Sequence, residues 1–249
     1  MKYYVCLFGS LFCGLLISGC SGIGEKQSDE MIIGSCPEHS IRLDADASEP
    51  VWKNAVPYNL HLIHQSQYVR ENAPFQPGTV RFLFDRDYLY VSAELADDDI
   101  VQYGSDNEDL CKRGDLLEIF IRNRRKGCYW EIHLSPAGKS ALLFYPNAGR
   151  RIFPEAIAKS TPVKLAVRLD GTLNNCRDND RGFRIEAAIP REVFGNDFGE
   201  NGIWTVMAAR YNYSRSFKVS QLSVSAALPA ADFHLVDFHT PVKFVHPGK

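Results

Sequence analysis

Five polar side chains in three alternating segments could bind a hydroxyl-rich ligand: Glu118, Glu131, His133, Arg210 and Asn212. Carboxylates accept hydrogen bonds from hydroxyl groups, whereas guanidinium and amide groups donate them, so the set offers both kinds of partner. In a strand, residues two apart point to the same face, which pairs Glu131 with His133 and Arg210 with Asn212. We predict a shallow groove that contains Glu118 together with Arg210 or Asn212.

The role of Glu118 has alternatives. In place of a ligand acceptor, it could be a structural carboxylate paired inside the fold with Arg210 or Arg184. In principle Glu118, Glu131 and Glu186 could supply the carboxylate pair of a glycoside hydrolase, one with a raised pKa and one ionised. The sequence contains no nucleophile elbow, phosphate loop or histidine-rich metal motif. We therefore predict a non-enzyme with no catalytic residues and no metal ligands.

The remaining candidates also have structural interpretations. Glu131 and His133 share a face with Tyr129, and such a row is more often an exposed sheet face than a groove. Arg210 and Asn212 could cap a loop at the end of a strand. Both alternatives stay open from the sequence.

These side chains belong to segments whose period of two predicts β-strands. Residues 116–121 and 129–134 predict a hairpin around a basic turn at 123–127, and both faces of its first strand are largely apolar, as expected for a strand covered on both sides. Further strands are expected at 80–84, 88–95, 141–145, 163–169, 183–189 and 203–213, with one helical turn at 190–194 and a closing segment at 233–244. The pattern predicts an all-β protein: one antiparallel, jelly-roll-like β-sandwich domain.

The first twenty residues predict export. Lys2 precedes an apolar run at 5–17 that is too short to span a bilayer, and Ile17-Ser18-Gly19-Cys20 resembles the cleavage site of a bacterial lipoprotein signal. An ordinary signal peptide with a chance cysteine is the alternative. On the favoured interpretation Cys20 is lipidated and anchors the protein to a membrane of the bacterial cell envelope.

The chain then divides into three parts. Residues 1–20 form the signal peptide, the small and polar residues 21–35 a flexible tether, and residues 36–249 the folded domain. A net charge of −2 provides no basic field for nucleic acid, so nucleic-acid partners are not expected.

Four cysteines of the expected domain predict at least one disulfide, because an exported chain folds in an oxidising compartment. Their spacing is irregular and does not suit a zinc site. The acidic stretch at 97–109 lacks the order of a calcium loop, and we expect a solvated loop. The cysteines are Cys36, Cys111, Cys128 and Cys176.

Several motifs occur in an order that is similar to one known family. The most specific is Gly114-Asp115, two further residues, Glu118-Ile119-Phe120-Ile121, and then an aromatic-rich strand. Others are Trp52, Tyr88-Leu89-Tyr90-Val91, Gly171-Thr172-Leu173-Asn174, Gly182 to Pro190, Arg210-Tyr211-Asn212-Tyr213 and Phe233-His234. This order resembles the family 9 carbohydrate-binding modules, which are β-sandwiches.

The resemblance implies a non-catalytic module that binds glycan or polysaccharide ends in support of carbohydrate catabolism, without a cofactor. Glu118 occupies the position of the family's sugar-contacting glutamate. Lys112 stands where one stacking tryptophan is expected, Glu131 where an arginine is expected, and the segment at 222–233 lacks the second tryptophan. Binding should therefore be weak, because stacked aromatic rings supply much of the apolar contact with a sugar.

Three rival functions remain. The chain could be a structural lipoprotein that scaffolds a surface complex of partner proteins and binds no sugar. It could be a glycoside hydrolase. It could also be a haem-binding module with Met207 as an axial ligand, although Met207 alternates with Ile203, Ala209 and Tyr211 in a pattern typical of a core strand.

Overall fold

The structure, a computed structural model, describes residues 30–63, 74–105, 109–147, 150–152, 163–215 and 220–246. The predicted signal peptide and Cys20 lie outside these residues. Within the described part of the chain, no helix is long and apolar enough to cross a bilayer.

Strands dominate the described residues, and the helical elements are short 3-10 turns. The strands are β1 (Met31–Ser35), β2 (Tyr58–Asn59), β3 (His61–Leu62), β4 (Gly78–Phe84), β5 (Tyr88–Ala96), β6 (Leu116–Asn123), β7 (Cys128–Leu134), β8 (Ser140–Asn147), β9 (Arg150–Ile152), β10 (Lys164–Asp170), β11 (Gly182–Pro190), β12 (Trp204–Asn212), β13 (Gln221–Val224) and β14 (Thr240–Val245). The turns are η1 (Pro50–Asn54), η3 (Leu110–Lys112), η4 (Arg191–Phe194) and η5 (Val236–Phe238).

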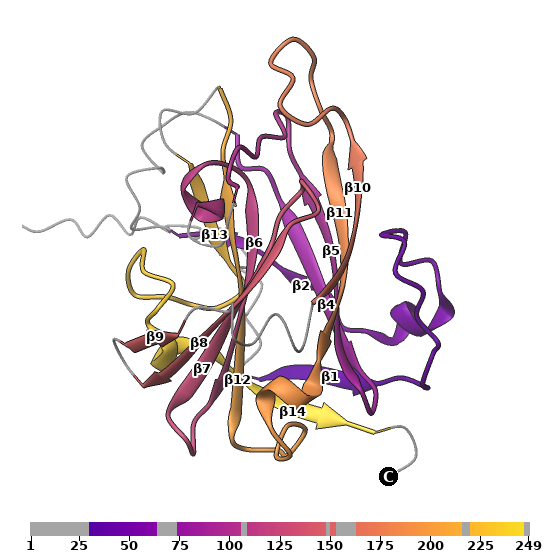
Figure 1. Cartoon of the computed structure of the whole chain (residues 1–249), viewed down its shortest axis with the longest axis vertical. Coiled ribbons are helices and arrows are strands. Elements are labelled where there is room, and N and C mark those ends of the chain that lie inside the picture. The colour runs from indigo at the N-terminus through magenta and orange to yellow at the C-terminus, as the bar shows by residue number, and fades with distance from the viewer. Residues whose placement is uncertain are drawn as a thin grey trace, which may run out of the picture.

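The strands form two layers (Figure 1). The first sheet has the order β10-β11-β5-β4, and the second has the order β12-β6-β7-β8-β9 with β13 paired to the far side of β12. The strands β1 and β14 join the two sheets at one end, so that hydrogen bonding runs almost continuously around the domain. The predicted all-β sandwich is confirmed in this coarse form, whereas the jelly-roll description of its connections stays a prediction.

The strand β1 departs from two expectations. It runs parallel to both of its neighbours, β14 and β4, whereas a wholly antiparallel sheet was expected. It also begins inside the segment predicted to be a tether: Met31 and Ile33 are buried in the core. The described domain therefore begins at β1 and not at Cys36, because two alternating apolar residues suffice to make a short strand once β14 and β4 provide hydrogen-bonding partners.

The hairpin of β6 and β7 has the predicted alternation. Leu117, Ile119 and Ile121 enter the core between the sheets, while Leu116, Glu118 and Phe120 point to the outer face of the second sheet. Phe120 is fully buried there in a second apolar cluster. Both faces of β6 are thus covered, which explains why its sequence is apolar on both sides.

The predicted disulfide is not present. Among the described residues no bond joins Cys36, Cys111, Cys128 or Cys176. Burial raises the pKa of the Cys128 thiol, and burial together with the nearby charge of Glu118 raises the pKa of Cys111 to about 11. Cysteine spacing could not show this, because a disulfide depends on whether the tertiary fold brings two Cβ atoms within about 4.5 Å.

Candidate functional site

Three of the five predicted site residues meet on the outer face of the second sheet. Glu118 on β6 lies directly opposite His133 on β7, and Glu131 lies two residues before His133 on the same face. The His133 Nε2 atom is 2.5 Å from Glu131 Oε1 and 3.2 Å from Glu118 Oε1. We call Glu118, Glu131 and His133 the Glu-His-Glu cluster.

Aromatic side chains of the neighbouring strands surround this cluster. The Tyr145 hydroxyl on β8 donates a hydrogen bond of 2.8 Å to Glu131 Oε2. The Tyr145 ring stacks on Tyr129, with centroids 4.3 Å apart and planes 9° apart. The Tyr129 hydroxyl lies 3.2 Å from Nδ1 of the exposed His234. One carboxylate is therefore held by a tyrosine that is itself fixed by stacking.

The two carboxyl groups of the cluster have opposite pKa shifts. Burial, opposed by His133 and reinforced by Glu131, raises the pKa of Glu118 to about 8. Burial also acts to raise the pKa of Glu131, but the hydrogen bond from His133, the charge of the imidazole and the bond from Tyr145 outweigh it and leave that pKa lowered. At neutral pH one carboxyl group is thus mainly protonated and the other ionised, as in a pair of groups with different chemical roles.

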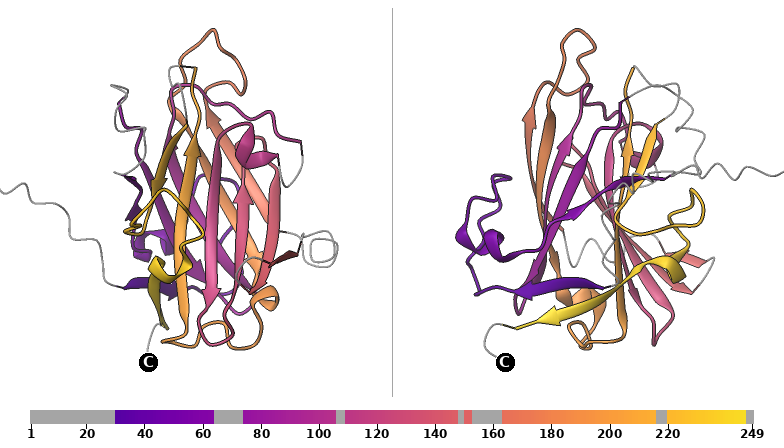
Figure 2. Two further views of the ribbon diagram at one scale, coloured as in Figure 1. Left: turned by 90° about the vertical axis from the view of Figure 1, so that its left-hand side faces the viewer. Right: turned by 180° about the vertical axis from the view of Figure 1, so that it is seen from behind.

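The cluster is closed to solvent in this structure. Glu118 and His133 are each 2% exposed and Glu131 is 5% exposed. The segment between β13 and β14 crosses the outer face of the second sheet (Figure 2, left). It packs Phe233 against Phe120 and Tyr211, and the imidazole of His239, also over Phe120, lies 2.9 Å from the Phe233 carbonyl oxygen. A ligand that contacts the cluster therefore has to displace side chains that cover it in this structure.

Arg210 and Asn212 lie on the opposite face of the same sheet. They follow Trp204 on the inner side of β12, and Arg210 Nη2 donates a hydrogen bond of 2.9 Å to Asp97 Oδ2 with both side chains fully buried. The Asn212 amide donates to Gln76 Oε1 at 3.0 Å. The structure therefore does not bring Glu118 together with Arg210 or Asn212 in one groove, and Glu118 pairs with His133 in place of either arginine considered for it.

The acidic stretch after β5 is also different from the expected solvated loop. Asp97 and Asp99 are buried, and Asp97 lies beside the buried Asp115. Asp115 accepts hydrogen bonds of 2.7 Å from the backbone N–H groups of Val101 and Tyr213. These carboxylates connect the ends of strands, which is a structural role.

Glu186 is separate from the other two glutamates considered for hydrolysis. It accepts hydrogen bonds from the Trp52 indole at 3.0 Å and from the backbone N–H groups of Asp44 and Ala45 at 3.1 and 2.7 Å. Glu186 therefore fastens the segment that contains η1 to the outer face of the first sheet, which explains the burial of Trp52.

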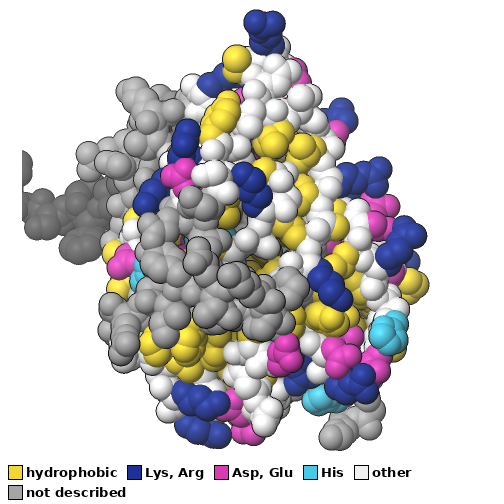
Figure 3. Space-filling view, in the orientation of Figure 1, with side chains coloured by type: hydrophobic (Ala, Val, Ile, Leu, Met, Phe, Trp, Pro, Cys, Tyr) yellow, Lys and Arg dark blue, Asp and Glu magenta, His cyan; other side chains and the backbone are white. Residues whose placement is uncertain are grey.

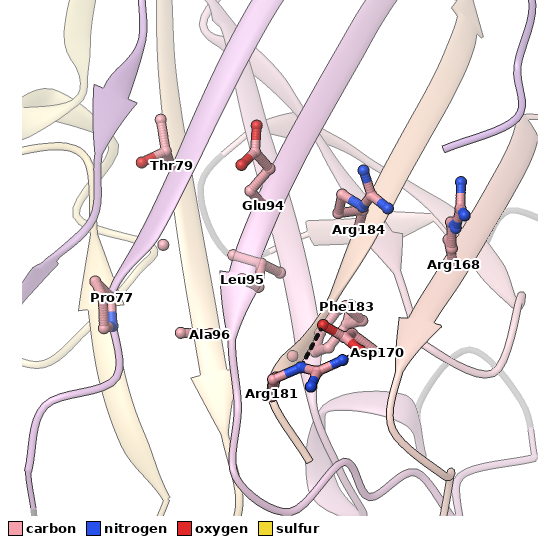
Figure 4. Close-up of a pocket in the computed structure, with 12 residues that line it drawn as sticks. Pro77, Thr79, Glu94, Leu95, Ala96, Arg168, Asp170, Arg181, Phe183 and Arg184 are labelled. Atoms are coloured by element: carbon pink, nitrogen blue, oxygen red, sulfur yellow. Dashed lines mark hydrogen bonds and ion pairs between the residues drawn. The ribbon is translucent and has the colours of Figure 1, made fainter. Parts of the chain in front are cut away.

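A groove of about 450 Å³ crosses the outer face of the first sheet (Figure 4). Thr79, Glu94, Arg184 and Arg168 lie in register across β4, β5, β11 and β10. Arg168 and Arg184 share one carboxylate oxygen of Asp46, at 3.0 and 2.9 Å. Acidic and basic side chains are also mixed along this side of the molecule in the space-filling view (Figure 3). This groove was not predictable from the sequence, because salt-bridged strand residues have the same pattern as any solvated sheet face.

Two neighbours of the cluster, Tyr145 and His234, were not predicted from the sequence. Tyr145 ended a short apolar segment, and its hydroxyl group was the one sign of a polar partner. His234 comes from a segment about a hundred residues after β7, and only the fold places it beside Tyr129.

Residues 43–132, from the segment before η1 to β7, match the family model described as carbohydrate family 9 binding domain-like. No curated protein shows a significant match.

The fold is similar to those of three solved structures. A protein from Bacteroides uniformis, provisionally described as carbohydrate-binding, is 14% identical with a TM-score of 0.68 over 87% of this chain and 99% of that one. Two structures of a family 9 carbohydrate-binding module from Caldicellulosiruptor kristjanssonii, in complex with cellotriose and with glucose, are 13% and 14% identical, with TM-scores of 0.56 and 0.53. They cover 87% of this chain in both cases and 94% and 96% of their own chains. The chain thus carries a carbohydrate family 9 binding domain-like region at residues 43–132, within a β-domain that has the fold of family 9 modules.

Proposed function

We propose that this protein binds glycan chains without cleaving them, on the outer face of the second sheet, with Glu118, Glu131 and His133 as its polar contacts. One observation carries the proposal. Three polar side chains converge beneath aromatic rings on β6 and β7, at the end of the region that matches a carbohydrate-binding family. Arg210 and Asn212 are outside the proposed site, because both are buried on the inner face with partners of their own.

The proposed site combines the two features that sugar recognition needs. Carboxylates accept hydrogen bonds from hydroxyl groups. The rings of Tyr129, Tyr145 and His234 lie beside them, and the two buried tyrosine rings would offer apolar surface to a pyranose once the residues that cover them are displaced. Each hydrogen bond between protein and sugar replaces hydrogen bonds to water, so it contributes only about 0.5–1.5 kcal/mol to the binding free energy. Displacing the segment over Phe120 opposes binding further, so we expect affinities near the millimolar range, about −4 kcal/mol.

Affinity electrophoresis in gels that contain soluble β-glucan, xylan, pectin or starch tests this proposal. The wild-type protein should be retarded by at least one polysaccharide, and Glu131→Gln, which removes the ionised acceptor of the cluster, should lose the retardation while thermal unfolding shows that it is folded. The matched control is Glu200→Gln, because Glu200 is an exposed glutamate that belongs neither to the cluster nor to the groove of Figure 4. Arg184→Gln tests the groove of Figure 4 as the rival site.

Each outcome has a definite meaning. Loss of retardation in Arg184→Gln alone would move the glycan to the first sheet. A wild-type protein that no polysaccharide retards would favour the scaffold interpretation. Release of reducing sugar from a retarding polysaccharide would contradict the non-catalytic part of the proposal.

We also propose that Cys20 carries lipid and anchors this domain to the bacterial cell envelope. The sequence Ile17-Ser18-Gly19-Cys20 after an apolar run supports it. Cys20→Ala should stop processing of the precursor and remove the acyl chains, as shown by mass spectrometry. A variant that is still processed at the same bond and keeps its membrane association would refute the anchor.

A further inference from the structure

We propose that Glu118, Glu131 and His133 form a binding site for one divalent transition-metal ion, of the class that takes mixed nitrogen and oxygen ligands, such as Zn²⁺. This inference goes beyond glycan binding and does not depend on it. It rests on the positions, the burial and the charges of the three side chains.

The donor atoms have the spacing that a shared ion requires. Metal–ligand distances of about 2.0–2.2 Å place neighbouring donor atoms roughly 3–3.5 Å apart. The distance from His133 Nε2 to Glu118 Oε1 is 3.2 Å, and one donor atom from each of the three residues lies within 4.8 Å of the others. The contact of 2.5 Å between His133 and Glu131 has to open by about half an ångström, which carboxylate rotation can provide.

Rigid elements hold all three side chains. Glu118 and His133 are direct partners in the ladder between β6 and β7, and Glu131 lies on the same face of β7. The hydrogen bond from Tyr145 to Glu131 Oε2 fixes the second carboxylate oxygen, as outer hydrogen bonds do at known metal sites. The sheet therefore orients the donors before any ion arrives.

Charge balance supports an ion at this place. The three groups are almost completely buried, and buried charges in proteins are paired or coordinate metals. Binding of the ion would release the proton of Glu118, and the two carboxylates with a neutral imidazole would then carry two negative charges, which one divalent cation neutralises. The side chains of His133 and Tyr145 hydrogen-bond with Glu131, and His133 also lies 3.2 Å from Glu118, whereas Asp115 in the same protein accepts from backbone N–H groups.

The donor set also selects the class of ion. One imidazole and two carboxylates suit Zn²⁺, Mn²⁺ or Fe²⁺ better than Ca²⁺, which takes six to eight oxygen ligands. Three protein ligands leave at least one coordination position for water or a ligand atom.

The test is metal uptake by the whole chain with no glycan present. Protein stripped with a chelator and dialysed against Zn²⁺ should retain roughly one ion per chain by mass spectrometry, and its unfolding temperature should rise with Zn²⁺ concentration. Co²⁺ in the same site should give visible absorption bands. Glu118→Gln and His133→Gln should each weaken binding at least about tenfold.

Matched controls separate this site from adventitious binding. Glu94→Gln and His61→Gln change exposed residues outside the cluster and should keep the ion. Equal retention in Glu118→Gln, or no ion and no Co²⁺ spectrum in the folded wild-type protein, overturns the proposal. If a cluster variant fails to fold, the wild-type stoichiometry and Co²⁺ spectrum decide. If glycans still retard the protein in chelator, and Zn²⁺ still binds when no glycan is present, the two kinds of binding are independent. Each proposal can then fail without the other.

Discussion

Two buried clusters on opposite faces of the second sheet each hold two carboxyl groups and one base. On the inner side, Arg210 pairs with Asp97, which lies beside Asp115. On the outer side, His133 lies between Glu118 and Glu131. The guanidinium of Arg210 is permanently charged, whereas the imidazole of His133 can lose its proton.

The two clusters also differ in the groups that donate hydrogen bonds to their carboxylates. Asp115 accepts from two backbone N–H groups, and Asp97 accepts from Arg210 and from the backbone of Asp99. Backbone donors cannot leave without unfolding the chain locally, so the inner cluster is committed to structure. The outer cluster depends on side-chain donors, which can turn toward a ligand or give way to an ion. This difference supports the proposal that ligands bind at the outer cluster and not at the inner one.

The largest expected effect comes from breaking the inner cluster. Arg210→Met leaves Asp97 and Asp115 buried without their cation, which should cost about 3–5 kcal/mol of the free energy of unfolding. Urea unfolding followed by fluorescence measures it. Arg168→Gln removes an exposed arginine from a surface ion pair and should cost under about 1 kcal/mol. Similar costs for the two variants would contradict the structural role of the inner cluster.

The segment that closes the outer cluster should loosen in mild acid. Burial lowers the pKa of His239 to about 4, so the folded state resists protonation that the unfolded chain accepts near pH 6.5. Stability is therefore retained above about pH 6.5 and falls as the pH drops toward 4, by about 2 kcal/mol at pH 5. His239→Gln should flatten this slope in urea unfolding between pH 7 and pH 5. A slope that survives the substitution unchanged assigns the acid sensitivity to other groups.

The smallest effect is expected at Glu118. In chelator at pH 7, Glu118→Gln should change the free energy of unfolding by less than about 1 kcal/mol, because burial raises the Glu118 pKa to about 8 and its carboxyl group is already mainly neutral. Asp115→Asn should cost more, about 1–3 kcal/mol, because it weakens the acceptor of two backbone N–H groups. Thermal and urea unfolding of the pair test this order, and the reverse order would assign Glu118 to structure.

The strands were predictable because each carries its own signal. The alternation of Leu117, Ile119 and Ile121 with Leu116, Glu118 and Phe120 identified a strand covered on both faces, and β4, β5, β10, β11 and β12 were expected within a few residues of their observed bounds. The same alternation placed Glu131 and His133 on one face. Short-range geometry was enough for these predictions, because side chains in a strand repeat every two residues.

Register and closure between distant segments were not predictable in this way. Whether Arg210 shares a face with Glu118 depends on which face of β12 turns inward, and a shift of one residue between β6 and β12 would place Arg210 opposite Glu118. Whether Met31 begins a strand depends on β14, more than two hundred residues later. The sequence by itself determined the strands and the residue types of the cluster, because both are local. Only the tertiary structure decided that Arg210 and Asn212 face away from Glu118 and that His234 lies beside the cluster, since that requires distant segments to meet in one register.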